Sequence, residues 1–320
     1  MFVMYVVRRI LGSIPVLLGI TVLVFLVSNL APGDPLLALM NPEAPASPEA
    51  LQALRVQYGL DKPLPIRYLV WLRELAQGNL GFSYASGRPV LTEIGDRLPA
   101  TLELMGAALL IAVVVGVSLG VISAVRRYTV VDYLVSAFSF TWVSLPDFFF
   151  GMILIYVVSL ELGLLPSFGI ATPGKPFSLT DNLAHLILPA TMLGLARAAV
   201  LARYARSSML DVLGQDYMTT ARAKGLRSAL VILRHGLRNA LIPIITVIGL
   251  TLPGLFGGAV IAETIFQWPG MGYLYIQAVG QRDYPMIMGL AFFSGATVLA
   301  ANLVTDLCYA LVDPRVIYGK

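Results

Sequence analysis

Long apolar runs separated by short polar segments dominate the pattern of this chain. A helix needs about 20 apolar residues to cross roughly 30 Å of hydrocarbon, whereas a barrel strand alternates over about ten residues. The runs are Ile10–Leu30, Thr101–Val125, Leu134–Leu160, Leu183–Leu201, Leu241–Ala262 and Met286–Leu311. The pattern therefore predicts an all-α polytopic membrane protein with six transmembrane helices.

Composition supports the bilayer as the environment of these runs. Apolar residues make up 58% of the 320 residues and charged residues 12%, which leaves too little polar surface to cover a soluble globule. Arg8 and Arg9 precede the first run, as basic residues do in a secretory signal. That run is long and no small-residue cleavage site follows it, so we expect a retained first span.

The distribution of lysine and arginine predicts the orientation. With an even number of spans both termini lie on one side, and that side collects Arg8, Arg9, Arg126, Arg127, the Arg203–Arg238 cluster, Arg315 and Lys320. The short loops of the other side hold only Lys175 and Arg282. Because basic residues accumulate in cytoplasmic loops, we expect both termini in the cytoplasm.

The spans divide the chain into four predicted parts. Residues 1–30 are the cytoplasmic N-terminus and first span, and residues 31–98 form an extracytoplasmic loop. Residues 99–311 form a five-helix core that includes a cytoplasmic loop at residues 203–240, and residues 312–320 form a cytoplasmic tail.

Two short helices are predicted in the extracytoplasmic loop. The first begins at Ser47-Pro48-Glu49 and stops at Gly59, and the second covers Ile66–Gln77 and stops at Gly78. Tyr68, Leu69, Leu72 and Leu75 fall on one face of the second helix. We expect this face to pack on the outer ends of the spans, with a contact surface for an external partner as the alternative.

Polar and helix-breaking residues interrupt the later runs. Pro146 and Asp147 stand inside the third run, where an ionisable residue is a functional hypothesis by default. The alternative is that Asp147 caps the continuation of a broken helix. Pro253 lies in the Gly- and Pro-rich fifth run, and Asn302 lies one turn from Asp306 in the sixth. Pro146, Asp147, Pro253 and Asn302 are the candidates for a translocation path, with polar packing as the alternative for Asn302.

The cytoplasmic segment Asp216–Arg238 is basic and helix-forming. It holds Arg222, Lys224, Arg227, Arg234 and Arg238 against the single acid Asp216. Gly225 follows Ala-Arg-Ala-Lys and is free to adopt the left-handed conformation that closes a helix. The segment therefore predicts a short helix presented on the cytoplasmic side.

Several kinds of chemistry have no pattern to support them in this chain. No GxxxxGK[ST] nucleotide loop, HExxH or CxxC occurs, and His185 and His235 stand without metal-ligand partners in the sequence. The basic residues are explained by topology and carry no interleaved aromatics, which disfavours nucleic-acid binding. We expect no enzyme activity, no metal and no cofactor bound by this chain.

Several segments together resemble the dipeptide, oligopeptide and nickel type permeases of ABC importers. They are Tyr5–Leu11 with Ala31–Pro35, Tyr58–Pro63, Gly78–Ser83, Asp216–Leu226 and Arg234–Ala240. Asp216–Leu226 is similar to the EAA loop of that family, in which a glycine follows an alanine-rich turn. Thr219-Thr220-Ala221 stands in place of Glu-Ala-Ala. The resemblance covers essentially the whole chain.

The resemblance implies a type I ABC importer permease fold in a prokaryotic inner membrane. Its implied partners are a homologous second permease, two ABC ATPase subunits that bind ATP and magnesium, an extracytoplasmic substrate-binding protein and membrane lipid. It implies that the ATPase docks on one short segment, made of Asp216, Tyr217, Thr220, Ala221, Arg222, Ala223, Lys224, Gly225 and Leu226.

The resemblance favours one half of the path of an ATP-driven importer of dipeptides or oligopeptides. Nickel chelates, glutathione and oligosaccharides are alternatives, because relatives carry them with similar permeases. A proton-coupled secondary transporter would use Asp147 and Asp306, but it would show internal inverted repeats and we find none. A membrane scaffold would leave the buried acid and the kinks without a purpose.

Overall fold

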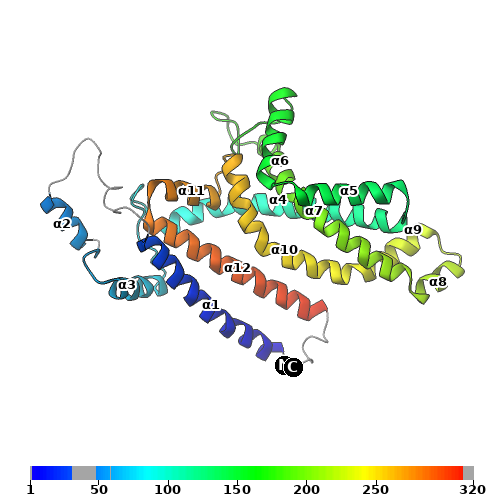
Figure 1. Ribbon diagram of the computed structural model, residues 1–320, viewed down its shortest axis with the longest axis horizontal. Helices are drawn as coiled ribbons and strands as arrows, with labels where there is room; N and C mark the ends of the chain where they lie inside the picture. Colours follow the sequence, from blue (N-terminus) through cyan, green and yellow to red (C-terminus); the bar gives the residue numbers. More distant parts are fainter. Residues whose placement is uncertain (1, 31–47, 58, 313–320) are drawn as a thin grey trace. The chain divides into compact units, whose positions relative to one another are not determined.

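The computed structural model describes residues 2–30, 48–57 and 59–312, and their regular structure is helical apart from one isolated bridge between Phe82 and Pro89 (Figure 1). The helices are α1 (Phe2–Leu30), α2 (Pro48–Gln57), α3 (Leu64–Ala76), α4 (Val90–Val125), α5 (Val130–Ser144), α6 (Asp147–Leu154), the π-helical η2 (Ile155–Glu161), α7 (Leu179–Leu213), α8 (Asp216–Ala223), α9 (Ser228–Leu230), the π-helical η3 (Val231–Leu237), α10 (Arg238–Ile265), α11 (Met271–Gln281) and α12 (Tyr284–Val312). The prediction of an all-α membrane protein is confirmed.

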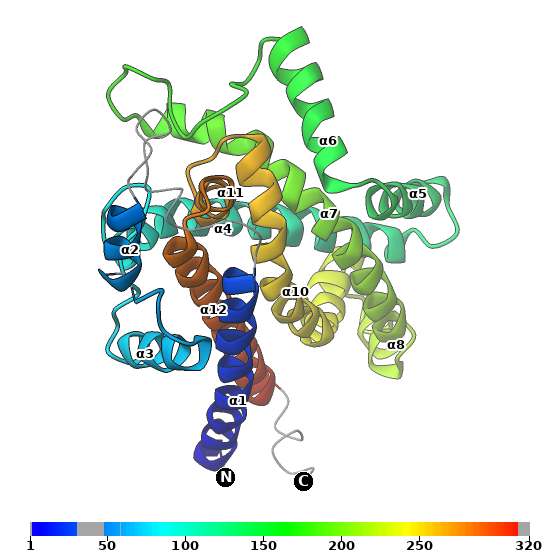
Figure 2. The same cartoon turned by 60° about the vertical axis from the view of Figure 1, so that its left-hand side comes forward.

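Four helices of the described chain are long and apolar enough to cross a membrane. They contain Val7–Leu30, Val90–Val125, Leu179–Leu213 and Tyr284–Thr305. Two bent pairs also qualify, one combining Val130–Ser144 with Asp147–Glu161 at 105° and one combining Ser228–Leu241 with Pro243–Gly249 at 49°. The sharp turn between α5 and α6 is visible in Figure 2. Each predicted run overlaps one of these segments, and the number of candidate spans is six if each bent pair is one span.

The two short helices predicted between the first two spans are present. α2 stops before Gly59, which has a φ of +65°, and α3 stops before Gly78, which has a φ of +80°. The proposed N-cap Ser47 lies outside the described residues. The predicted packing face of α3 was wrong at Leu69, which is 63% exposed. Trp71 lies beside α1 in its place, with its ring 6.1 Å from that of Phe25.

The described helices separate into two compact units, residues 1–100 with 269–299 and residues 101–268 with 300–320. In the first unit, the start of α4 packs against α11 and the first turns of α12 through an apolar core of Leu80, Val90, Ile94, Met271, Leu274, Ala278, Met286 and Leu290. Asp283 is buried beside this core. Its carboxylate accepts from Ser83 Oγ at 2.5 Å and from the Met286 N–H at 3.2 Å, so it both caps α12 and fixes the loop before α4.

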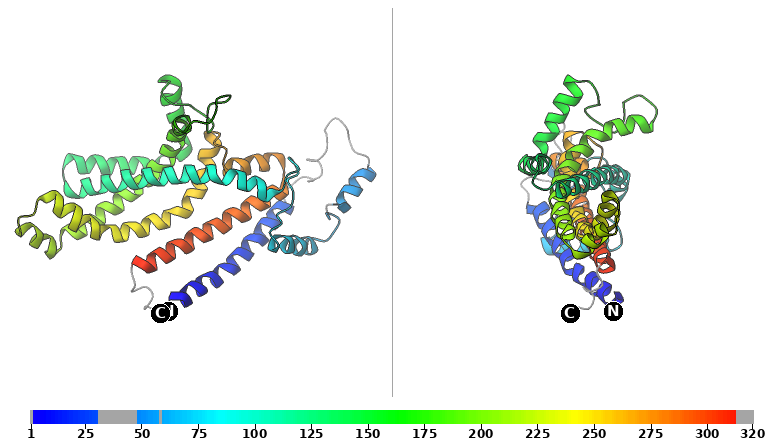
Figure 3. Two further views of the ribbon diagram at one scale, coloured as in Figure 1. Left: turned by 180° about the vertical axis from the view of Figure 1, so that it is seen from behind. Right: turned by 90° about the vertical axis from the view of Figure 1, so that its right-hand side faces the viewer.

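In the second unit α7 packs against α4, α5, α6 and α10. Small residues permit its close approach to α4, seen from behind in Figure 3. A methyl group on Gly116 would lie 2.7 Å from the Ala198 carbonyl oxygen, and one on Gly120 would lie 2.5 Å from that of Ala202. The backbone contact leaves no room for larger side chains at these glycines, so this seam holds α7 in one register beside α4.

Candidate functional site

The segment predicted to dock a partner on the cytoplasmic side forms α8 and the turn after it. α7 continues past the apolar run through polar residues to Leu213, and Gly214 and Gln215 then redirect the chain into α8. Gln215 is the N-cap residue of α8, and its extended backbone turns the chain away from the axis of α7. α9 and η3 return the chain to α10 (Figure 1).

One face of α8 is fixed by packing. Met218 is fully buried and Ala221 is 8% exposed, and both contact Val231 at the start of η3. Beneath them the Met218 side chain comes close to Gly236, where an added methyl group would lie 3.5 Å from its terminal carbon. The predicted docking residue Ala221 therefore belongs to the packing face. Met218 was missed, although its spacing of three from Ala221 places both on one side of a helix.

The ends of α8 match the electrostatics of a helix. Asp216 lies in the first turn and Arg222 in the last, where each charge opposes the nearer end of the helix dipole. Lys224 is the C-cap residue, and Gly225 follows with a φ of +75°. The prediction that a left-handed glycine closes this helix is confirmed. Space is open around Gly225, so only the backbone torsion restricts that position.

The rest of α8 and its turn is exposed. Tyr217 is 41% exposed and Leu226 is 38% exposed, while Thr220, Arg222, Ala223 and Lys224 are also on the surface. A shallow depression of about 500 Å³ adjoins the helix and is lined by Asp211, Val212, Gln215, Tyr217 and Asn239. α8 is thus an exposed basic helix beside a shallow depression, and Met218 and Ala221 fix its opposite face by packing. This geometry is suited to docking another protein.

An ion pair between the buried Asp132 carboxylate and the partly exposed Arg206 guanidinium ties α7 to α5. Arg206 on α7 donates from Nε to Asp132 Oδ1 at 2.7 Å and from Nη2 to Asp132 Oδ2 at 2.8 Å. Ser123, at the end of α4, donates to the same carboxylate, and the Tyr128 N–H donates to it at 2.9 Å. Asp132 is 3% exposed, and its carboxylate is bound by three segments of the chain. This bidentate network was not predicted.

The break between α5 and α6 presents Asp147. Pro146 is the N-cap residue of α6, and the N–H groups of Phe149 and Phe150 donate to its carbonyl oxygen. Asp147 occupies the first turn and is half-buried, but its side chain makes no hydrogen bond or ion pair with the described residues. It is therefore not a hydrogen-bonded cap. A carboxylate at this position gains stabilisation from the helix N-terminus and remains available to a solvated path.

The kinked α10 exposes backbone groups that α7 and α12 satisfy. Pro253 has no N–H, which leaves the Gly249 carbonyl without its helical donor. Thr305 Oγ1 of α12 donates to that carbonyl at 3.0 Å. Beside the same proline, Arg197 Nη2 of α7 donates to the Gly254 carbonyl at 2.9 Å. Arg197 was missed, although a cation inside the run Leu183–Leu201 was itself a signal.

The candidates for the translocation path do not form one hydrogen-bonded site. Within the described part of the chain, no hydrogen bond or ion pair joins Asp147, Pro253 and Asn302. The Asn302 side chain is exposed, and the Asp306 side chain lies outside the described residues. No group of three or more metal-ligand side chains occurs in the described residues.

Comparison with known protein families identifies the family of this chain. Residues 116–318 match the family described as the inner membrane component of binding-protein-dependent transport systems, and residues 1–105 match the N-terminal region of such membrane components. The chain belongs to this family. It is therefore a permease component of an ABC importer, as its sequence resemblance implied.

Relatives within the permease family match over nearly their full length. This permease is 46% identical over 315 residues to the oligopeptide transport system permease protein AppB of Bacillus subtilis (strain 168), covering 98% of this chain and 99% of that protein. It is 42% identical over 314 residues to the glutathione transport system permease protein GsiC of Escherichia coli (strain K12), covering 98% and 99%. The inward-facing MetNI methionine ABC transporter shares the fold, with a TM-score of 0.55 and 18% identity over 70% of this chain and 97% of that chain.

Proposed function

We propose that this permease forms half of the translocation path of an ATP-driven, binding-protein-dependent importer of dipeptides or oligopeptides. The other half would come from a homologous second permease. Two ABC ATPase subunits would bind ATP and magnesium, and an extracytoplasmic binding protein would deliver the substrate. This chain would hold no cofactor of its own.

The observation that carries the proposal is the exposed helix α8 in a member of this family. Its Met218 and Ala221 face is packed, and the opposite face and the turn at Gly225 are exposed. An ATPase that binds the exposed face would move α8 together with η3 and α7, because those elements share its core. Such a movement would favour one of two permease states according to the nucleotide bound.

A peptide substrate is favoured by the relative named as an oligopeptide permease, at 46% identity. The relative named as a glutathione permease, at 42% identity, supports glutathione as the second candidate. Glutathione is itself a small peptide, so both candidates share amide bonds and carboxylates. In this design the binding protein makes most of the selection, and the permease spans carry little of it.

We propose that both termini and α8 face the cytoplasm. The basic residues of the short loops gather on that side, which supports this orientation. A reporter that is active only outside the cytoplasm should give a signal when fused after Gly78 and none when fused after Leu226. The reverse pair of signals would contradict the orientation.

We propose that Asp147, Arg197, Pro253 and Asn302 lie along the path, with Pro146 setting the break beside Asp147. Arg197 is the strongest member, because a guanidinium in the middle of α7 is costly unless a backbone carbonyl or water solvates it. The carboxylate of a peptide is a group that this cation could hold transiently. The half-buried Asp147 could do the same for a peptide amine.

The function is tested by purifying the permease with its co-expressed neighbours and reconstituting it in vesicles. We expect an ATPase to co-purify in stoichiometric amount and labelled peptide to accumulate only with ATP and the binding protein. Uptake driven by a pH gradient without ATP would contradict the proposal. Glutathione taken up in preference to tripeptides of other sequence would select the second candidate.

The same assay tests the path. Arg197→Gln and Asp147→Asn should each lower uptake at least tenfold. Each variant removes a charge whose interaction with the substrate would contribute about 1.4 kcal/mol, and that free energy corresponds to a tenfold change. The control is Arg203→Gln, which changes an exposed arginine on the same helix as Arg197. Assembly with the ATPase should be unchanged in all three. Normal uptake in both path variants would restrict these residues to structural roles.

A further inference from the structure

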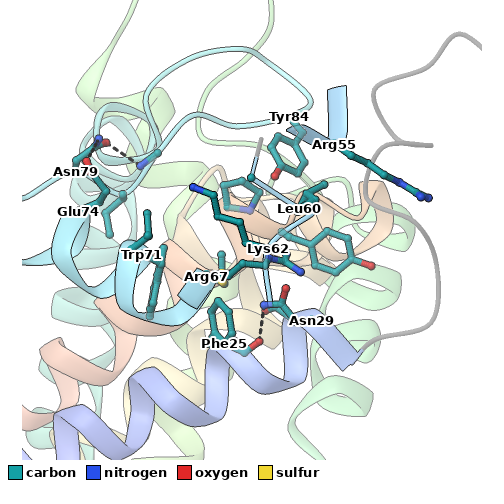
Figure 4. Close-up of a pocket in the computed structure, with 18 residues that line it drawn as sticks. Phe25, Asn29, Arg55, Leu60, Lys62, Arg67, Trp71, Glu74, Asn79 and Tyr84 are labelled. Carbon is teal, nitrogen blue, oxygen red and sulfur yellow. Dashed lines mark hydrogen bonds between the residues drawn. The ribbon is translucent and has the colours of Figure 1, made fainter. Parts of the chain in front are cut away.

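A cavity of about 600 Å³ lies in the extracytoplasmic part of the first unit. Its walls come from the end of α1, the end of α2 and the segment that joins it to α3, one side of α3, the segment after α3, and the first turns of α12 (Figure 4). None of the residues proposed for the translocation path or for ATPase docking lines this cavity. Its lining combines an apolar floor with several cations.

Aromatic side chains form the floor where α3 crosses α1. Phe25 of α1 is in edge contact with Tyr68, with 5.3 Å between ring centroids, and lies 6.1 Å from Trp71. The Tyr68 hydroxyl also lies 2.9 Å from Thr21 Oγ1. Tyr and Trp with a polar tip and an apolar body favour the boundary between hydrocarbon and water. This cluster therefore places α3 at the level of the lipid headgroups.

The outer face of α3 agrees with that position. Ile66 is 48% exposed, Leu69 is 63% exposed and Val70 is 49% exposed, and their spacing of three and four puts them on one side of the helix. A short helix that leaves such a face uncovered and carries Arg67 and Arg73 beside it has the character of an interfacial helix. Its apolar side chains would then contact acyl chains.

Two cations of the cavity, Lys62 and Arg67, have no carboxylate partner among the described residues. Arg67 is half-buried, and its guanidinium makes no ion pair or hydrogen bond with the described residues. Burial lowers the pKa of the Arg67 guanidinium, and the nearby Tyr84 opposes this shift. Lys62 lies beside Arg67 in Figure 4. Glu74 is the single acid among the lining residues that the structure describes, and its Oε2 accepts from Asn79 Nδ2 at 2.8 Å.

A partly desolvated guanidinium without a carboxylate is most stable when an anion occupies the space before it. The planar fork of arginine suits a phosphate, which can accept two of its N–H groups at once. The apolar continuation of the site is also present, because Leu18 and Val22 of α1 are 45% and 42% exposed and lie on the same side of the helix as Phe25, seven and three residues before it. The cavity therefore has a place for an anionic head and a surface for a chain.

We propose that this cavity binds an anionic phospholipid, with its phosphate on Arg67 and Lys62 and its acyl chains against Phe25, Trp71 and the exposed face of α1. The lipid would come from the outer leaflet, a detail that rests on the proposed orientation. Binding itself does not depend on that orientation or on the transported substrate. The bound lipid would fix α3 against α1.

Trp71 provides the probe for this site. The full chain is placed in nanodiscs containing brominated phosphatidylglycerol or brominated phosphatidylcholine, and the fluorescence of the Trp71→Phe variant is subtracted to isolate Trp71. We expect brominated phosphatidylglycerol to quench Trp71 at a mole fraction on the order of tenfold lower than brominated phosphatidylcholine does. Arg67→Gln should abolish this preference, and Arg67→Lys should retain part of it.

Arg73→Gln is the matched control, because Arg73 is an exposed cation on the same helix outside the cavity. It should keep the preference. Equal quenching by both lipids, or equal loss in the Arg67 and Arg73 variants, would overturn the proposal. Inorganic phosphate should not relieve the quenching, and relief by phosphate would identify a free-anion site. Retention of phosphatidylglycerol by the unmodified chain in native mass spectrometry gives a second readout that needs no variant.

Discussion

Arg206→Met should destabilise the permease by about 3 kcal/mol, because it leaves the Asp132 carboxylate buried without its cation. The Nε and Nη2 atoms of Arg206 both donate to that carboxylate, and the Asp132 side chain is only 5% exposed. The free energy of unfolding in detergent, measured by equilibrium denaturation, reports the loss. Arg203→Met on the same helix should have little effect, because Arg203 is exposed.

The double variant Asp132→Leu with Arg206→Met separates a lost ion pair from a lost arginine. Apolar replacement of both members of a buried pair is often nearly neutral. Recovery should nevertheless be partial here, since the Ser123 hydroxyl and the Tyr128 N–H would lose their acceptor. If Arg206→Met costs no more than Arg203→Met, the pair contributes nothing measurable.

The ion pair also has a consequence for coupling. Arg206 lies on α7 ahead of α8, while Asp132 lies in the first turn of α5. A displacement of α8 that moved the end of α7 would therefore pull on α5 and on the break before Asp147. Uncoupled ATP hydrolysis in the Arg206 variant, with assembly intact, would be the sign of that connection.

The spans could be predicted because hydrocarbon imposes one rule on every residue of a segment. A run of about 20 apolar residues needs no knowledge of its neighbours, and all six runs were found as helical segments. The ends of helices follow no such rule. α7 extends twelve residues beyond the predicted run, from Leu201 to Leu213, because a helix can continue through polar residues such as Arg203 and Arg206 after its apolar run has ended.

α11 was not predicted, since its apolar residues are too few to mark a span. Met271, Leu274 and Ala278 are buried at spacings of three and four, while the rest of the helix is more polar. That pattern is amphipathic and needs the first turns of α12 as a partner, which only the tertiary structure supplies. Gly270 before it was a local signal, whereas the left-handed conformation of Arg282 after it is not indicated by that residue type.

In the candidate site, too, local features could be predicted from the sequence and contacts between distant residues could not. Gly225 was predicted because a helix end is a local property of the chain, and a glycine just after such an end is free to take a positive φ. The Asp132–Arg206 pair joins residues 74 positions apart, and no periodicity links them. Met218 and Ala221 could be placed on one side of α8, but which side is packed depends on Val231 of another element.

Gly225→Val should uncouple ATP hydrolysis from transport. A β-branched residue at a φ of +75° is strained by about 1–2 kcal/mol, and the strain is relieved by tilting α8 or by losing its last turn. Nothing lies within 4 Å of the position that an added Cβ would take, so the effect would come from the backbone and not from a clash. In the reconstituted complex, ATP-driven uptake should fall at least tenfold. Hydrolysis should no longer respond to loaded binding protein.

Gly225→Asn is the matched control, because asparagine tolerates the left-handed conformation that valine does not. It adds a side chain of similar size at the same exposed point and should preserve most of the uptake. Both variants should insert and pair with the second permease, as measured by co-purification. Equal impairment by Asn and Val would mean that the ATPase needs the bare glycine surface. Full uptake with Val would mean that α8 is a cytoplasmic connection and not the coupling element.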